Sequence, residues 1–246
     1  MLEGIHKIHL IGIGGSGMRA IANILIQKGY EVSGSDVKES DVIERFRQMG
    51  ATVHIGHNAD YVQGVDAVVR STAIREDNPE IVAAKEQGIT ILHRSDIVKA
   101  VLDVTNGIAV AGAHGKTSTT SMIGQILVEG QMEPTVIIGG EVDYLKGSSC
   151  LGKGEYSVVE ADESDGSFLK LRPKTIVITN IEDDHMDHYK TMENLLNAFC
   201  QFVETLPVDG KAVVCGDNDN IRYVMSKVAR QFITYGLEET NDYVAK

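Results

Sequence analysis

Residues 109–120 read AVAGAHGKTSTT, an apolar run that leads into a glycine-rich turn followed by Lys116 and Thr117. This order predicts a buried strand, a phosphate-binding loop and a helix, the opening unit of an α/β nucleotide-binding domain. In such a loop the backbone N–H groups point inward, the lysine faces the β- and γ-phosphates, and the threonine hydroxyl can bind Mg²⁺. The loop is shorter than G-x-x-x-x-G-K-[ST], because Val110 occupies the place of the first glycine. The stretch therefore predicts ATP as a ligand.

A second glycine-rich loop lies near the start of the chain, at residues 12–17 (GIGGSG). Gly12, Gly14 and Gly17 satisfy G-x-G-x-x-G between a predicted strand and a predicted helix, where the helix N-terminus attracts a diphosphate. Asp36 ends the next predicted strand, close to where dinucleotide-binding folds place a ribose acceptor. The pattern favours a diphosphate ligand over a ligand-free turn. It does not choose between NAD and another nucleotide diphosphate.

Composition limits the class of protein. The 246 residues, 43% of them hydrophobic, are enough for two cores of ordinary size. A formal charge of -12 would repel a nucleic-acid backbone, so a nucleic-acid partner is not expected. No apolar run approaches the roughly 20 residues that span a bilayer, and no membrane partner is expected. Three scattered cysteines, Cys150, Cys200 and Cys215, indicate a reducing compartment, and we expect a cytoplasmic protein.

Strand-like and helix-like runs alternate along the whole chain, which favours parallel sheets with right-handed crossovers. Ser40 or Asp41 is the expected cap of the second helix. A polar break at 103–107 (DVTNG) separates two such series. We therefore expect a Rossmann-like parallel-sheet domain at 1–103 and a P-loop α/β ATP-binding domain at 107–246. In the first domain the predicted strands are 5–14, 30–36, 51–56, 65–73 and 89–94, and the predicted helices are 18–29, 40–50 and 78–88. In the second domain, after the strand that precedes the phosphate loop, the predicted strands are 156–162, 175–181 and 211–217, and the predicted helices are 117–130, 192–206 and 220–230, the last of which ends before 231–236.

Two acidic segments follow predicted strands of the second domain. The first, VVEADESDGSF at 158–168, carries Glu160, Asp162, Glu163 and Asp165, and the second, NIEDDHMDHY at 180–189, carries Asp184, His185, Asp187 and His188. Carboxylates suit Mg²⁺, and a neighbouring histidine suggests a second metal position. Acidic runs are also common in solvated loops. Because ligands of such folds bind at the carboxyl ends of strands, we favour metal sites here.

Six segments in order resemble the Mur ligase family, most closely its alanine-adding branch. They are GIGGSGMRAIANIL, SGSD, STAIREDNPEIVAA, GAHGKTSTT, EADESDGSFL and TNIEDDHMDHY, and the resemblance runs from about residue 4 to the last residue. It implies an ATP-dependent ligase of peptidoglycan biosynthesis that joins L-alanine to UDP-N-acetylmuramate. ATP would phosphorylate the lactyl carboxylate to an acyl phosphate, which the amine of L-alanine then attacks. The glycine-rich loop at 12–17 would hold the UDP diphosphate, and the loop that leads into Lys116 would hold the ATP.

The resemblance also implies roles for individual residues. Lys116, Glu160 and His185 would be catalytic, Lys116 by contacting the β- and γ-phosphates. Thr117 and Glu160 would hold one Mg²⁺ and His185 a second. The ATP site would comprise Gly112, Ala113, His114, Gly115, Lys116, Thr117 and Ser118, and the UDP-sugar site Gly14, Ser16, Gly17 and Met18, with Asp36 and Ser71 as further contacts.

Some features depart from the family pattern. Ala113 replaces the usual threonine of the phosphate loop, which leaves the backbone contacts available. Family members carry a third domain, so we expect this chain to be an amino-terminal fragment that ends within the central domain and binds with little turnover. Three alternatives stay open: a murein tripeptide ligase of cell-wall recycling, an NAD-dependent oxidoreductase, and a non-catalytic nucleotide-binding module. The sequence makes no prediction of oligomeric state.

Overall fold

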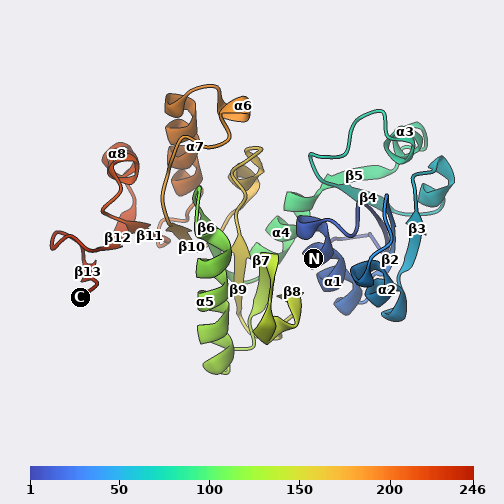
Figure 1. Cartoon of the computed structure of the whole chain (residues 1–246), viewed down its shortest axis with the longest axis horizontal. Coiled ribbons are helices and arrows are strands. Elements are labelled where there is room, and N and C mark those ends of the chain that lie inside the picture. Colours follow the sequence, from blue (N-terminus) through green and yellow to red (C-terminus); the bar gives the residue numbers. More distant parts are fainter. The chain divides into compact units, whose positions relative to one another are not determined.

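Two β-sheets organise the chain, and the computed structural model describes them over all residues from Met1 to Lys246 (Figure 1). The chain divides into two compact units: residues 1–100 with 137–151, and residues 101–136 with 152–246. No helix combines the length and apolar character that crossing a bilayer requires.

The sheet of the first unit has five strands in the order β3-β2-β1-β4-β5, and every neighbouring pair is parallel. The strands are β1 (Lys7–Ile11), β2 (Glu31–Asp36), β3 (Thr52–Ile55), β4 (Ala67–Arg70) and β5 (Thr90–His93). This order matches the first five strands of the doubly wound nucleotide-binding sheet, in which the strand order reverses beside β1. The predicted Rossmann-like sheet is therefore confirmed.

Four helices follow these strands: α1 (Ser16–Gln27), α2 (Asp41–Gln48), α3 (Pro79–Glu86) and α4 (Arg94–Leu102). Helix α1 buries an apolar face at near-helical spacing, and Ile21, Ile24 and Leu25 are almost completely buried. Ser40 caps α2, because its side chain accepts a hydrogen bond from Ile43 N. Of the two predicted caps, Ser40 is thus the one used. Helix α4 was not among the predicted helices.

A polar cluster is buried within this unit around Glu80, the second residue of α3. His9 Nε2 lies 3.1 Å from Glu80 Oε2, Ser35 Oγ donates to the same oxygen at 2.7 Å, and His57 Nδ1 lies 3.0 Å from Oε1. Burial alone would raise the pKa of Glu80, but the hydrogen bonds from His9, Ser35 and His57 outweigh it and hold the pKa below its ordinary value. The buried carboxylate thus ties β1, β2 and the loop after β3 to α3.

The second sheet has eight strands in the order β13-β12-β11-β10-β6-β9-β7-β8. Its central run from β12 to β9 is parallel throughout. The strands are β6 (Asn106–Ala111), β7 (Thr135–Val142), β8 (Gly147–Cys150), β9 (Tyr156–Glu160), β10 (Thr175–Ile178), β11 (Lys211–Cys215), β12 (Gln231–Gly236) and β13 (Tyr243–Val244). The predicted parallel α/β architecture is confirmed, whereas β7, β8 and β13 were not predicted.

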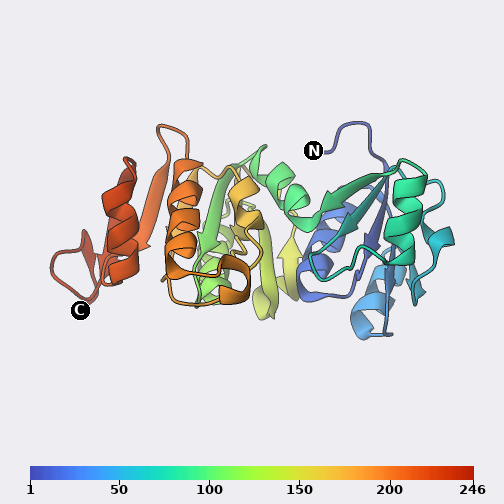
Figure 2. The ribbon, with the colours of Figure 1, turned by 90° about the horizontal axis from the view of Figure 1, so that it is seen from above.

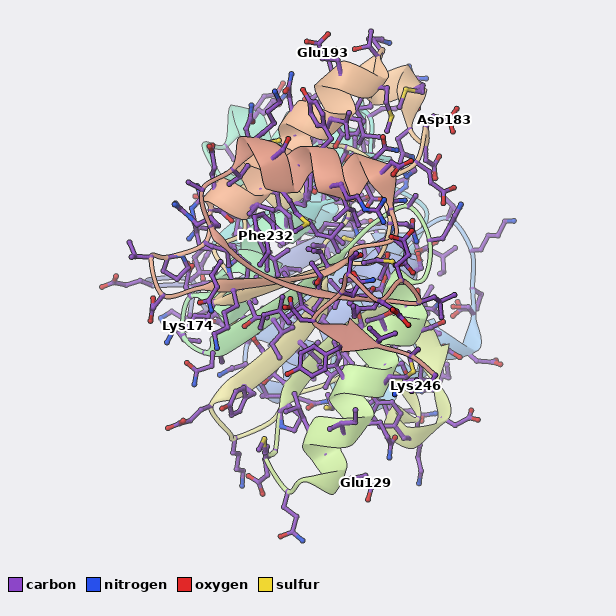
Figure 3. All side chains as sticks on the ribbon, turned by 90° about the vertical axis from the view of Figure 1, so that its left-hand side faces the viewer. Glu129, Lys174, Asp183, Glu193, Phe232 and Lys246 are labelled. Carbon is purple, nitrogen blue, oxygen red and sulfur yellow. The ribbon has the colours of Figure 1, made fainter.

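Helices cover this sheet on both faces. Helix α5 (Lys116–Glu129) lies on one face, and α7 (Met192–Glu204) and α8 (Asp219–Lys227) lie side by side on the other (Figures 1 and 3). The short α6 (Met186–Tyr189) precedes α7, as the ribbon in Figure 2 shows. Under α7, Phe168 packs against Phe199 and Phe202, with ring centroids 5.4 and 4.7 Å away. This aromatic cluster anchors the segment that follows β9.

Replacing Glu80 by glutamine should lower the free energy of unfolding by about 1–3 kcal/mol at neutral pH, because a charged hydrogen-bond acceptor is lost. The folded-state pKa of Glu80 lies below its ordinary value of 4.5, so its stabilisation is complete above that value and is lost as the pH falls through the folded-state pKa. Glu80→Gln should therefore flatten the acid side of the stability profile. Urea unfolding from about pH 7 to about pH 3 measures this.

The matched control is Glu86→Gln, an exposed carboxylate of the same helix, which should stay within about 0.5 kcal/mol of the wild type. An acid limb in Glu80→Gln as steep as that of the wild type would contradict the prediction.

Candidate functional site

The candidate site lies where three neighbouring strands of the second sheet end. Strand β6 pairs in parallel with β9 on one side and with β10 on the other, with Val110 opposite Glu160 and Ala111 opposite Ile178. Parallel strands present their carboxyl ends at one edge of the sheet. The phosphate loop after β6 and the two acidic segments after β9 and β10 therefore share that edge.

The segment after β10 holds the phosphate loop in shape. Asn180 receives a hydrogen bond from His114 N on its Oδ1 (2.9 Å), and its Nδ2 donates to His114 O (3.0 Å). Thr179 Oγ1 donates to the same carbonyl at 2.6 Å. Gly112 has φ 134°, and a Cβ placed there would lie 2.2 Å from Thr179 Oγ1, so only glycine fits. The backbone of the phosphate loop is therefore held in place by hydrogen bonds from the segment that follows β10.

Helix α5 begins at Lys116 directly after this loop, and Gly115 is its cap with φ 83°. The first N–H groups of a helix have no partner within it, and the helix dipole adds partial positive charge there. Thr117 and Ser118 lie exposed in this first turn. Backbone donors and two hydroxyls are therefore available to an anion at this point, which is the arrangement of a phosphate site.

The Lys116 side chain bends back onto the loop and onto the segment after β9. Its Nζ donates to Gly112 O at 2.5 Å and to Glu163 Oε1 at 2.7 Å. The Glu163 side chain is only 2% exposed. Burial raises the pKa of Glu163, while the hydrogen bond and charge of Lys116 act in the opposite direction. Glu163 was noted in the sequence as one of several acids, but nothing in the sequence singled it out as the partner of Lys116.

His185 lies beside the same carboxylate. Its Nε2 is 3.6 Å from Glu163 Oε1 and 3.6 Å from Asp184 Oδ2. His185 has φ 58°, an uncommon left-handed backbone for a non-glycine residue, at the start of α6. Tyr189, one turn further on, donates its hydroxyl to Glu163 O, and burial raises the pKa of that hydroxyl. Lys116, Glu163 and His185 therefore form one contiguous group.

Glu160 is the last residue of β9, and it lies opposite Val110 of β6, shortly before the phosphate loop begins at Gly112. Its Oε1 is buried and has no hydrogen-bond partner. The Oε2 atom of Glu163 is likewise buried and has no hydrogen-bond partner. Buried unpaired carboxylate oxygens are costly and are suited to a hard cation. No three carboxylate, histidine or cysteine side chains converge as a ready-made metal site, so phosphate oxygens or water would have to complete the coordination of Mg²⁺.

The glycine-rich loop of the first unit is braced by the end of β2. Ser35 O accepts from Gly12 N (2.8 Å) and Ile13 N (3.1 Å), and Asp36 Oδ2 accepts from Gly14 N (2.9 Å). Through Ser35, the loop is also connected to the buried Glu80 carboxylate. Asp36 therefore holds the shape of the loop, and both of its carboxylate oxygens already have backbone donors, since Lys38 N donates to Oδ1 at 3.4 Å.

The other predicted contacts of this loop lie at or near the start of α1. Ser16 is exposed, whereas Met18 is 3% exposed and its N–H donates to Gly15 O, so its side chain belongs to the core. Ser71 follows β4, the strand next to β1. The structure adds Arg94, which sequence reasoning missed: a Cβ on Gly17 would lie 2.5 Å from its Nη1. A guanidinium over the loop is suited to a diphosphate.

Gly112→Ala should lower the free energy of unfolding by about 2–4 kcal/mol, because a methyl group would overlap Thr179 and the backbone is outside the range of other residues. Gly115→Ala is the comparison. Its φ is also positive, but the nearest atom to a Cβ is 3.9 Å away, so a cost of about 1–2 kcal/mol is expected. Urea denaturation measures both, and equal losses would show that Thr179 does not limit residue 112.

Comparisons with known proteins agree with this arrangement. Residues 7–104 match the Mur ligase family, catalytic domain, and residues 110–246 match the Mur ligase middle domain. The chain is 45% identical over 240 residues to UDP-N-acetylmuramate–L-alanine ligase of Desulfatibacillum aliphaticivorans, covering 98% of this chain and 53% of that protein. It is 45% identical over 246 residues to the same ligase of Syntrophus aciditrophicus, covering 100% and 51%. The chain thus spans about half the length of these curated relatives.

Two solved structures are also similar. UDP-N-acetylmuramate–alanine ligase from Thermotoga maritima has a TM-score of 0.84 and 31% identity, over 95% of this chain and 53% of that chain. The UDP-N-acetylmuramate:L-alanyl-gamma-D-glutamyl-meso-diaminopimelate ligase from Neisseria meningitides has a TM-score of 0.88 and 27% identity, over 95% and 78%. With both family domains matched in order across nearly all of its residues, the chain belongs to the Mur ligase family.

Proposed function

We propose that this chain supplies the sugar-nucleotide and ATP sites of an ATP-dependent ligase that joins L-alanine to UDP-N-acetylmuramate in peptidoglycan biosynthesis. The observation that carries the proposal is the group formed by the phosphate loop, Lys116, Glu163 and His185 at one sheet edge. The 45% identity to alanine-adding ligases over the whole chain supports the choice of acceptor.

The proposed reaction brings two anions together. The lactyl carboxylate of the sugar nucleotide attacks the γ-phosphoryl group of ATP and displaces ADP. The amine of L-alanine then attacks the acyl phosphate, loses a proton and displaces phosphate, which leaves an amide bond. Transfer to a carboxylate requires positive charge around the moving phosphoryl group. Lys116 and the first N–H groups of α5 are the protein's own contribution to that charge.

Divalent cations would supply the remaining charge, with Thr117 and Glu160 as ligands of one Mg²⁺ and His185 as a ligand of a second. A bound Mg²⁺ would polarise the phosphoryl oxygens and offset the repulsion between carboxylate and triphosphate. The unpaired Glu160 Oε1 supports this assignment.

The first unit is proposed to hold the UDP-sugar diphosphate. Gly14 and Gly17 would allow close approach of the backbone at the N-terminus of α1, and Ser16 would add an exposed hydroxyl. Met18, Ser71 and Asp36 are the remaining proposed contacts. We also propose that the domain boundary lies within 103–107, that ATP and Mg²⁺ are the ligands of the second domain, and that the protein acts in the cytoplasm, which the three free cysteines support.

Lys116→Gln should weaken ATP binding at least about tenfold, because a charge-assisted contact to phosphate is removed. Lys174→Ala, at the amino-terminal side of β10, should leave the affinity unchanged. Isothermal titration calorimetry with Mg²⁺ and ATP measures both affinities, and thermal unfolding checks that both variants fold.

Calorimetry also tests the ligand of the first unit, which we expect to bind UDP-N-acetylmuramate. Tight binding of NAD without binding of UDP-N-acetylmuramate would refute the sugar-nucleotide assignment.

The tripeptide-adding ligase of Neisseria meningitides has the higher TM-score of the two solved structures, so its acceptor is a second candidate. In the full-length protein, we expect kcat/KM for L-alanine to exceed that for the tripeptide by at least about tenfold. Phosphate release that depends on the acceptor measures the ratio. Glu160→Ala is the control and should abolish release with either acceptor, whereas a preference for the tripeptide would reverse the assignment.

A further inference from the structure

Glu163 is the most deeply buried acid at the phosphate loop, with 2% of its side chain exposed. One carboxylate oxygen binds the Lys116 ammonium at 2.7 Å, and the other, Oε2, is buried without a partner. Its backbone carbonyl is held by the Tyr189 hydroxyl. The Glu163 side chain and backbone are therefore both held by protein groups, the carboxylate by Lys116 and the carbonyl by Tyr189.

The Lys116 ammonium is fully used by the protein. A lysine ammonium has three N–H donors. Its three acceptors are Gly112 O at 2.5 Å, Glu163 Oε1 at 2.7 Å and Ala113 O at 3.4 Å. A phosphate oxygen can therefore reach Lys116 only by replacing one of these acceptors. The longest bond, to Ala113, is the weakest and the first to exchange, which leaves Glu163 attached to the ammonium.

This arrangement changes the charge that a nucleotide meets. The Glu163 carboxylate offsets part of the positive charge that Lys116 brings to the loop, and Glu160 adds a negative charge at the end of β9. A triphosphate without a cation would be repelled by these carboxylates, since charges in a partly buried site are weakly screened. A triphosphate that carries a divalent cation has less net negative charge and would be repelled less.

We propose that Glu163 is a positioning residue that holds the Lys116 ammonium in the loop and, through its charge, makes the site select cation-bound nucleotide over free nucleotide. The inference rests on the proposed function, because it concerns the ATP site. It assigns Glu163 a task separate from those of Glu160 and His185, and it explains why a buried acid faces the lysine of a phosphate loop.

The experiment compares Glu163→Gln with the wild type in ATP binding, with EDTA and with excess Mg²⁺, by calorimetry. Glutamine keeps the shape and removes the charge, so affinity for free ATP should rise at least about tenfold, the scale of a charge-assisted hydrogen bond. Affinity for Mg²⁺-bound ATP should change less, so the ratio of the two affinities shrinks. Glu129→Gln is the matched control: this exposed acid at the far end of α5 accepts only from Gln125 and should change either affinity less than about twofold.

A second variant separates the positioning of the Lys116 ammonium from the effect of the negative charge of Glu163. Glu163→Asp keeps the carboxylate but withdraws it by one methylene, so amide hydrogen exchange at residues 112–118 should accelerate without nucleotide, while the preference for Mg²⁺-bound ATP persists. This measurement remains decisive if Glu163→Gln fails to fold, because unchanged exchange in Glu163→Asp overturns the holding role.

The outcomes are distinct. If the wild type binds no nucleotide under either condition, the proposed ATP site and this inference both fall. If the wild type binds Mg²⁺-bound ATP but Glu163→Gln binds free ATP no better, or loses affinity equally under both conditions, only the role of Glu163 is overturned.

Discussion

Parallel pairing of β6 with β9 and β10 is the constraint on which the site depends. It delivers three chain segments to one sheet edge although they are separated by tens of residues in sequence. The middle segment forms the phosphate loop, and its neighbours brace it, Asn180 from one side and Glu163 from the other. A phosphate loop on an isolated strand would lack both supports. The sheet therefore provides the geometry as well as the scaffold.

The two glycine-rich loops obtain their shape by the same physical means. In each, a side chain from the neighbouring strand end bonds to the loop's backbone: Asp36 to Gly14 in the first unit, and Asn180 to His114 in the second. They differ in where the neighbouring cation comes from. The second loop is followed by a lysine, and the first has Arg94 across it from another element. In a chain of net charge -12, these local cations and the helix N-termini are what an anionic ligand can use.

Much of the fold could be predicted because apolar periodicity and glycine turns are local signals. They located the five strands of the first sheet, whereas the domain boundary at 103–107 stays a prediction. Strands β7 and β8 were missed because β7 runs into Gly139 and Gly140, and β8 reads GSSC, without the apolar alternation that marks a strand. Helix α4 was missed because it starts directly after β5, with no turn between them.

The candidate site was predictable only in part. Residue type and order pointed to Lys116, and the family resemblance pointed to Glu160 and His185; these roles stay predictions. The sequence could not rank the four acids of the segment after β9, because their ranking depends on which side chain turns inward beside Lys116. Glu163 does so, since Phe168 anchors the segment behind it and Tyr189 holds its carbonyl. Arg94 was missed for a similar reason: it reaches Gly17 from a distant element.

The cluster around Glu80 has a consequence for how this chain can vary. One carboxylate satisfies donors from three different segments, and Ser35 transmits its position to the backbone of the glycine loop. Replacing any single member leaves the others with an unmatched buried charge or donor. The residues at these four positions are therefore energetically coupled: Glu80, His9, Ser35 and His57. Evolutionary change in this cluster would require paired, compensating substitutions rather than a series of single neutral ones.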